Sequence, residues 1–177
     1  NDISLKDSVL VTQEFDFSAP ALNFTTRVPH DSRVETVPME PTEPNTIGKV
    51  MVIGKIAPRE GDLKVEATMI GYNLQAPAAA LRICSFDVEA LGYTIRIFRT
   101  APDLTEAKLL GKKASNGKPQ SAVLSYCFAR SQQALGIYFI VDVSGAASEE
   151  AADDLVRRAD EYAASFVDNL SWQNGQQ

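Results

Sequence analysis

Apolar positions in the last third of the chain follow two successive patterns. Residues 136–143 form an almost continuous apolar run, Gly-Ile-Tyr-Phe-Ile-Val-Asp-Val, with the length and composition of a buried strand. After a short Ser-Gly-Ala-Ala-Ser break, apolar residues recur at steps of three and four, as on one face of a helix. We expect this stripe to pack the C-terminal helix, which the pattern ends near Trp172: Leu155, Ala159, Tyr162, Phe166 and Leu170.

The start of this predicted helix has its own signals. Ser148 is a suitable N-cap, because its hydroxyl can accept a hydrogen bond from a free backbone N–H of the first turn. Acidic residues follow it at Glu149 and Glu150, where the positive end of the helix dipole favours them. Two pairs at i,i+4 spacing are expected along the polar face, namely Asp153 with Arg157 and Asp154 with Arg158.

Two antiparallel hairpins are predicted upstream of the helix. The first joins strands over 49–57 and 63–74 through a turn at Pro58 to Asp62, and the second joins strands over 121–130 and 135–143 through a loop at 131–134. The strands of the second hairpin are apolar on both faces. A sheet of this kind must be covered on both faces.

The middle of the chain supplies the other expected elements. Pro77 suits the first turn of a helix, apolar residues keep helical spacing after it, and Gly92 suits its end. A strand is predicted over 93–99, and residues 104–113 are either a short helix or the approach to another strand. Asn116-Gly117 is the strongest turn signal in the sequence.

The N-terminal region is expected to begin with an arm or short edge strand over residues 1–13. Two short strands follow, separated by a kink at Ala19-Pro20, and they carry the apolar positions Phe15, Phe17, Leu22, Phe24 and Val28. We predict one α+β domain over 14–172, with a Pro-rich loop over 29–45 and a flexible tail over 173–177.

These elements predict a central antiparallel sheet flanked by helices, an αβα sandwich. Their order resembles that of the PsbP-like proteins: N-terminal strands with Phe-x-Phe before a proline, a strand over 65–74, a helix, a hairpin ending in 136–141, and a terminal helix with Ala164-Ser165-Phe166. That group includes the photosystem II extrinsic protein, a Ran-binding relative and bacterial periplasmic relatives. The resemblance covers most of residues 14–170 and implies a binding or accessory role, with no site residue carried over.

The Pro-rich loop is the segment that we expect to bind a protein partner. Pro38, Pro41 and Pro44 have the three-residue spacing of a polyproline II helix, and Glu35, Glu40 and Glu43 give the segment negative charge suited to a basic partner surface. The alternative is a stiff strap across the surface, since no arginine flanks the prolines.

Charge and composition narrow the function classes. The net charge of −6 argues against nucleic acid and against anionic membrane surfaces, and no apolar run approaches the roughly 20 residues that span a bilayer. The chain begins at Asn1 without methionine, from which we expect removal of a signal peptide and a periplasmic or secreted location. The oligomeric state is left open.

Two cysteines, Cys84 and Cys127, lie too far apart in sequence for a C-x-x-C motif or a metal pair. The favoured interpretation is two buried free thiols that act as small apolar residues. The alternative is a disulfide, which needs the two Cα atoms within about 7 Å.

No nucleotide-binding, nucleophile-elbow or H-E-x-x-H motif is present, and no cofactor or metal is expected. We therefore predict a non-catalytic binding or accessory protein of the cell envelope. The alternative is a hydrolase or metal-dependent enzyme that uses His30, with a cysteine as nucleophile, or surface carboxylates such as Asp87 and Glu89.

Aromatic residues on neighbouring strands have two interpretations. They could line a pocket for an apolar ligand, or they could simply fill the core, which we favour because buried aromatics most often do so. The residues concerned are Phe86, Tyr126, Phe128, Tyr138, Phe139 and Trp172.

Overall fold

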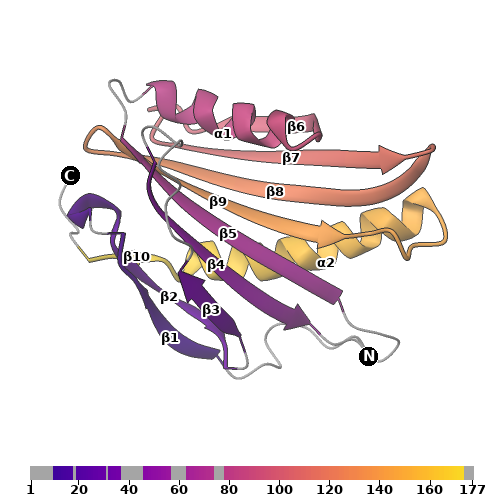
Figure 1. The fold of residues 1–177 in the computed structure, drawn as a ribbon, viewed down its shortest axis with the longest axis horizontal. Coiled ribbons are helices and arrows are strands. Elements are labelled where there is room, and N and C mark those ends of the chain that lie inside the picture. Colours follow the sequence, from indigo (N-terminus) through magenta and orange to yellow (C-terminus); the bar gives the residue numbers. More distant parts are fainter. Residues whose placement is uncertain are drawn as a thin grey trace.

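A computed structural model of the chain describes residues 10–17, 19–30, 32–36, 46–56, 63–73 and 78–173. Within these ranges, strands dominate and form two antiparallel sheets, with two α-helices packed against them (Figure 1). The helices are α1 (Ala78–Ala90) and α2 (Glu149–Asp168), and a short 3-10 helix covers Pro20–Leu22. The strands are β1 (Leu10–Phe15), β2 (Phe24–Pro29), β3 (Arg33–Thr36), β4 (Thr46–Ile56), β5 (Leu63–Asn73), β6 (Thr94–Thr100), β7 (Glu106–Ser115), β8 (Lys118–Arg130), β9 (Gln133–Asp142) and β10 (Ser171–Trp172).

The larger sheet has the order β3-β4-β5-β9-β8-β7-β6 and contains both predicted hairpins, β4–β5 and β8–β9. The predicted turn at Asn116-Gly117 joins β7 to β8, and both residues have positive φ, 52° and 76°, as a tight two-residue hairpin turn requires. The turn between β8 and β9 is shorter than predicted. It uses Ser131 and Gln132 alone, with φ of 48° and 63°, and Gln133 already belongs to β9.

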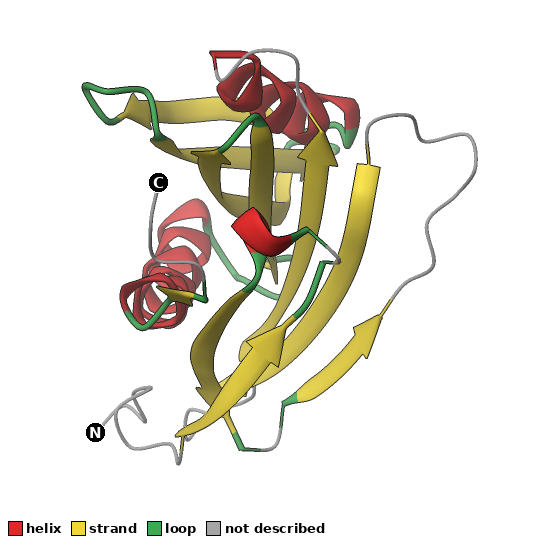
Figure 2. Ribbon diagram, turned by 90° about the vertical axis from the view of Figure 1, so that its left-hand side faces the viewer, coloured by secondary structure: helices red, strands yellow, loops and turns green. Residues whose placement is uncertain are grey.

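The two faces of the larger sheet carry different helices. Side chains of β5, β8 and β9 alternate between two buried clusters, one beneath α2 and one beneath α1. Figure 2 shows α2 and α1 on opposite sides of the twisted sheet. The predicted mixed α+β class with an antiparallel sheet is therefore confirmed, and the layer on the α2 side also contains the small sheet β1-β2-β10.

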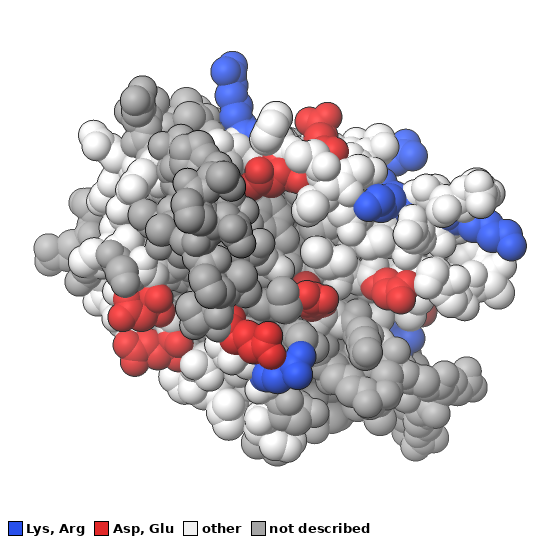
Figure 3. Space-filling model, viewed as in Figure 1, with Lys and Arg blue, Asp and Glu red and all other residues white. Residues whose placement is uncertain are grey.

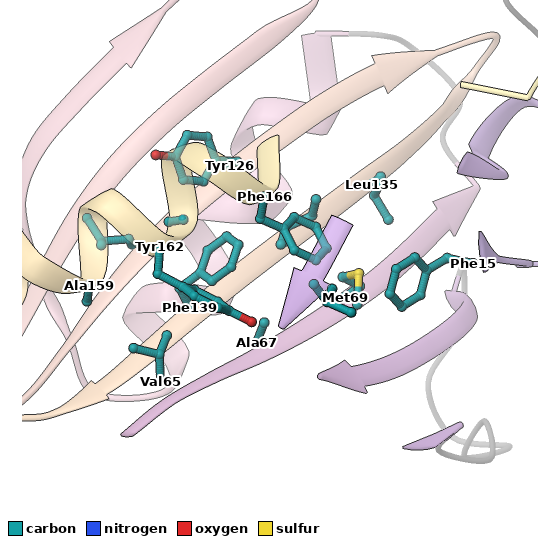
Figure 4. Packing of buried hydrophobic residues seen from close by; sticks show 14 of the residues in the cluster. Phe15, Val65, Ala67, Met69, Tyr126, Leu135, Phe139, Ala159, Tyr162 and Phe166 are labelled. Atoms are coloured by element: carbon teal, nitrogen blue, oxygen red, sulfur yellow. The ribbon is translucent and has the colours of Figure 1, made fainter. Parts of the chain in front are cut away.

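The core beneath α2 is aromatic. Phe166 of α2 lies with its ring centroid 5.5 Å from that of Phe139, 6.1 Å from Phe15 and 6.3 Å from Phe24. Tyr162 lies edge-on to Phe139 one turn earlier, as Figure 4 shows. These contacts join α2, the larger sheet and the small sheet in one core. Of the predicted helix stripe, the central part is fully buried, whereas Leu155 and Leu170 are only half-buried.

The start of α2 follows its sequence signals. The Oγ atom of Ser148 accepts a hydrogen bond from the backbone N–H of Ala151 at 3.1 Å. The helix ends at Asp168, before Trp172, and the chain then forms β10 against β2. The predicted i,i+4 pairs are replaced by other pairs: Arg157 binds Asp154, and Asp153 reaches the larger sheet.

The core beneath α1 is smaller and is cross-linked. Cys84 of α1 and Cys127 of β8 form a disulfide, with their Cα atoms 6.4 Å apart. The favoured prediction of free thiols was wrong. The packing of α1 on β8 brings the two cysteine side chains together, and the sequence alone does not reveal that packing. Beside the disulfide, Val88 of α1 packs closely over β7, where a Cβ on Gly111 would lie 3.0 Å from the Val88 Cγ1 atom.

The N-terminal strands confirm the predicted kink. β1 and β2 pair antiparallel on either side of the 3-10 helix at Pro20–Leu22, and the five predicted apolar positions are buried. Arg130 fixes this segment to the larger sheet, because its Nε donates to the carbonyl of Ala21 at 2.7 Å while its guanidinium stacks 4.0 Å from the Trp172 ring centroid.

One segment of open type and part of the predicted loop are strands in the structure. Residues 106–115 form strand β7, which resolves the alternative of helix or strand over 104–113. Within the predicted loop over 29–45, Pro29 ends β2 and residues 33–36 form β3, because Val34 packs against the main core and the backbone pairs with β4. Residues 37–45, like residues 1–9 and Pro77, lie outside the described residues. Among the helices that the structure describes, neither has the length and apolarity needed to cross a membrane.

Candidate binding groove

A groove runs between α2 and the outer strands β6 and β7. Helix α2 packs over β8, β9 and β5, so the α2-facing side of β6 and β7 extends beyond the helix. Two neighbouring cavities of about 400 and 320 Å³ lie there and share Lys112, Asp153 and Val156 in their linings. We call this combined surface the α2 groove.

Strand register builds the floor of the α2 groove in rows. Ile97 pairs with Leu110, which pairs with Leu124, and this apolar row faces Val156 of α2. The next row along the strands is Arg99, Lys108 and Tyr126. An apolar strip therefore lies directly beside a basic one.

A β-bulge at Arg96 decides which side chains of β6 reach the groove. Ile95 pairs with Gly111, and Ile97 pairs with the next residue, Leu110, so one residue is inserted between them. Without that insertion, alternation would turn Ile97 to the α1 side, where Ile95 packs. The bulge thus brings Ile97 and Arg99 to the α2 side.

Two ion pairs cross the groove and hold β7 to α2. The Lys108 ammonium lies 2.9 Å from Asp160, and the Lys112 ammonium lies 2.7 Å from Asp153. Burial alone would lower the pKa of Lys108, but its hydrogen bonds with Asp160 and Tyr126 outweigh burial and raise that pKa. Lys108 is thus a fixed cation in the basic row of the groove.

The lining is positive, in contrast to the whole chain. The two cavities are lined by twice as many cations as carboxylates: Arg96, Arg99, Lys108, Lys112, Lys113 and Arg157 against Glu149, Asp153 and Asp160. The net charge of the chain is −6. Figure 3 shows another face of the molecule, where basic side chains project at the end near the β7–β8 turn and acidic ones are spread from the lower left to the top. A site in which a cationic row lies beside an apolar row suits a ligand that is anionic and partly apolar.

Of the six residues predicted to bind a partner, the structure describes only Glu35. It lies on β3, with its carboxylate 3.0 Å from the Arg33 guanidinium. Pro38, Glu40, Pro41, Glu43 and Pro44 lie outside the described residues. The partner-binding role of the Pro-rich segment stays a prediction.

The alternative of an enzyme that uses His30 lacks the cysteine nucleophile that was considered for it. Because Cys84 and Cys127 are joined, neither is a thiol nucleophile in this structure. His30 is exposed at the end of β2, and Glu89 is exposed on α1. Within the described residues, no group of three His, Cys, Asp or Glu side chains has the geometry of a metal site.

Asp87, the other carboxylate considered for an enzyme, accepts hydrogen bonds that join α1 to the larger sheet. Its Oδ2 atom accepts hydrogen bonds from the phenols of Tyr72 and of Tyr138, the latter at 3.2 Å. Burial raises the pKa of both tyrosines, and the nearby Asp87 charge raises it further. Both phenols therefore remain neutral donors to Asp87, which ties α1 to β5 and β9.

The aromatic residues considered for a pocket divide between two cores and the surface. Tyr126, Phe128 and Phe139 belong to the core beneath α2, and Tyr138 belongs to the core beneath α1. Trp172 packs edge-on to Phe128. These positions confirm the core interpretation, whereas Phe86 is 70% exposed.

The sequence analysis missed the groove residues because none of them belongs to a recognisable motif. Residues 93–99 were predicted as a strand, but alternation alone gives no sign of the bulge at Arg96. Lys108 and Lys112 lie in the segment whose type was left open. Lys108 and Lys112 are four residues apart with Leu110 midway, so all three share one face of a strand, which would have indicated a basic face once β7 was assigned as a strand.

No family model matches the chain, and no curated protein matches it. Among solved structures, the chain is similar to LpqN, described as involved in cell envelope biogenesis of Mycobacterium tuberculosis, with a TM-score of 0.48 and 15% identity over 94% of this chain and 93% of that chain. A similarity of this size assigns neither a family nor a function.

Proposed function

We propose that this chain is a non-catalytic binding protein that holds an anionic, partly apolar ligand in the α2 groove. The observation that carries the proposal is the lining of the groove, where the apolar row of Ile97, Leu110 and Leu124 runs beside the cations Arg99 and Lys108. Apolar surface supplies affinity and the cations supply selectivity for negative charge.

A location outside the cytoplasm is part of the proposal. The Cys84–Cys127 disulfide supports it, because disulfides persist in oxidising compartments such as the periplasm and the extracellular space. The proposal also includes an αβα sandwich and a relationship to the PsbP-like proteins. Both rest on the order of the elements in the sequence, which resembles that of the PsbP-like group.

A fluorescence titration with 1-anilinonaphthalene-8-sulfonate tests the groove, because this probe combines apolar rings with one sulfonate. We expect saturable binding that weakens at least fivefold in Arg99→Glu, since the change inverts a charge beside the apolar row. The matched control is Arg82→Glu, which makes the same charge change on the exposed side of α1 and should stay within twofold of the parent. The unsulfonated 1-anilinonaphthalene should show no difference between Arg99→Glu and the parent.

Affinity for the sulfonated probe should also fall as salt is raised, because the Debye length shortens to about 3 Å at 1 M ionic strength. Equal binding by the parent and Arg99→Glu would contradict the proposed site. Turnover in a panel of ester, amide and phosphate substrates that is lost in His30→Ala would favour the enzyme alternative.

A further inference from the structure

Strand β6 is the free edge of the larger sheet. The sheet order ends β8-β7-β6, so within the described residues the outer N–H and C=O groups of β6 face no neighbouring strand. β6 is seven residues long, and beyond the bulge it is regular from Ile97 to Thr100 in register with β7. Such an edge is able to pair with an added strand.

The side chains of β6 leave this edge open and positive. Ile97 and Phe98 are 44% and 43% exposed, on opposite faces of the strand. Arg96 and Arg99 flank them, both exposed, and neither takes part in an ion pair among the described residues. β6 contains no acidic residue.

The opposite edge strand of the sheet, β3, differs in its charge and in its exposed apolar surface. β3 is only four residues long, and its Arg33 is already paired with Glu35 at 3.0 Å. Edge charges and bulges ordinarily oppose strand addition, so the arginines and the bulge of β6 admit only a partner whose charge neutralises them. β6 combines exposed apolar side chains with arginines that have no ion-pair partner among the described residues.

Resting on the proposed function of the α2 groove, we propose that its ligand is an extended acidic peptide segment that pairs with β6 as an eighth strand of the sheet. Two neighbouring apolar residues of the peptide lie opposite Ile97 and Phe98, one on each face. Carboxylates on either side of them lie near Arg99 and Arg96. The recognised pattern is therefore acidic, apolar, apolar, acidic.

A second copy of this chain fits the same edge poorly. Residues directly opposite each other in an antiparallel pair lie on the same sheet face, so two copies of β6 related by a two-fold axis pair through Ile97 with Ile97 or Phe98 with Phe98. Either register brings four arginines onto one shared edge with no carboxylate from β6, and like charges close together repel. The charge of β6 thus favours an acidic partner over self-association.

The test uses a fluorescein-labelled peptide with a central Glu-Val-Val-Glu between threonines, and its permuted control with a central Val-Glu-Glu-Val. Fluorescence polarisation should show the first peptide binding at least tenfold more tightly than the second. Arg99→Glu should weaken the first peptide at least fivefold, and Arg82→Glu should leave it within twofold.

Backbone pairing has its own signature. Alternate N–H groups of an added strand point to opposite sides, so N-methylation of one alternate set should abolish binding, whereas methylation of the other set should be tolerated. Amide hydrogen exchange should slow in β6 when the peptide binds. Equal effects of the two methylated sets, or protection outside β6, would overturn the inference.

Failure of this inference is distinguishable from failure of the proposed function. If the sulfonated probe still binds the groove but neither peptide binds, the strand addition is wrong and the groove stands. If neither the probe nor the peptides bind, both proposals are wrong. Sedimentation that shows a dimer with protected β6 amides would replace the acidic peptide with a second copy.

Discussion

Replacing Phe166 with alanine should destabilise the fold strongly, because this side chain joins three parts of the core. It is 1% exposed on α2, and its ring contacts those of Phe139, Phe15 and Phe24. Truncation of a buried phenylalanine to alanine costs about 3–5 kcal/mol. The upper part of this range is expected here, because edge-on aromatic pairs add about 0.5–1.5 kcal/mol beyond area burial.

Urea unfolding followed by circular dichroism measures this loss directly. A cost of about 3–5 kcal/mol corresponds to a fall in Tm of roughly 6–20 °C for a chain of this size. The matched control is Phe86→Ala, the same truncation on a helix at a side chain that is 70% exposed, where we expect a change of about 0.5 kcal/mol or less. If the two variants unfold at the same urea concentration, α2 is not docked through Phe166.

Three further predictions concern the cross-link, the buried phenols and the Pro-rich segment. Replacing Cys84 and Cys127 together with alanine should lower the free energy of unfolding by about 2–4 kcal/mol, because the disulfide spans 43 residues; unchanged urea midpoints under non-reducing conditions would contradict this. Burial and the Asp87 charge raise the pKa of the Tyr72 and Tyr138 phenols above the ordinary 10.0. The contribution of these two phenols to the free energy of unfolding is therefore complete below pH 10, and it is lost as the pH rises and the phenols of the unfolded chain ionise. Urea midpoints from pH 8 to 11 should therefore fall less steeply in the Tyr72→Phe, Tyr138→Phe double variant than in the parent, and parallel curves would refute the assignment. A short Gly-Ser linker in place of residues 37–44 should change the free energy of unfolding by about 1 kcal/mol or less, since loop length costs little, while weakening capture of a protein partner; a collapse of stability would show instead that the segment is a strap over the core.

Local patterns in the sequence determined the elements that depend on near neighbours. The hairpin β8–β9 follows from its apolar runs, the turn at Asn116-Gly117 from residues that tolerate positive φ, and the start of α2 from Ser148 and the acids after it. Each of these signals lies within a few residues of the structure that it specifies. The choice of Phe166 as a core residue follows in the same way from the helical period.

Tertiary structure alone decided the features that join distant segments. The Cys84–Cys127 disulfide depends on the register of α1 against β8. Asp153 binds Lys112 across the groove because α2 lies over β8, the neighbour of β7. Residues 106–115 became a strand because β8 and β6 pair with them on both sides. The α2 groove itself exists because a single inserted residue, Arg96, turns the side chains that follow it toward α2, a shift set by strand pairing that no period in the sequence records.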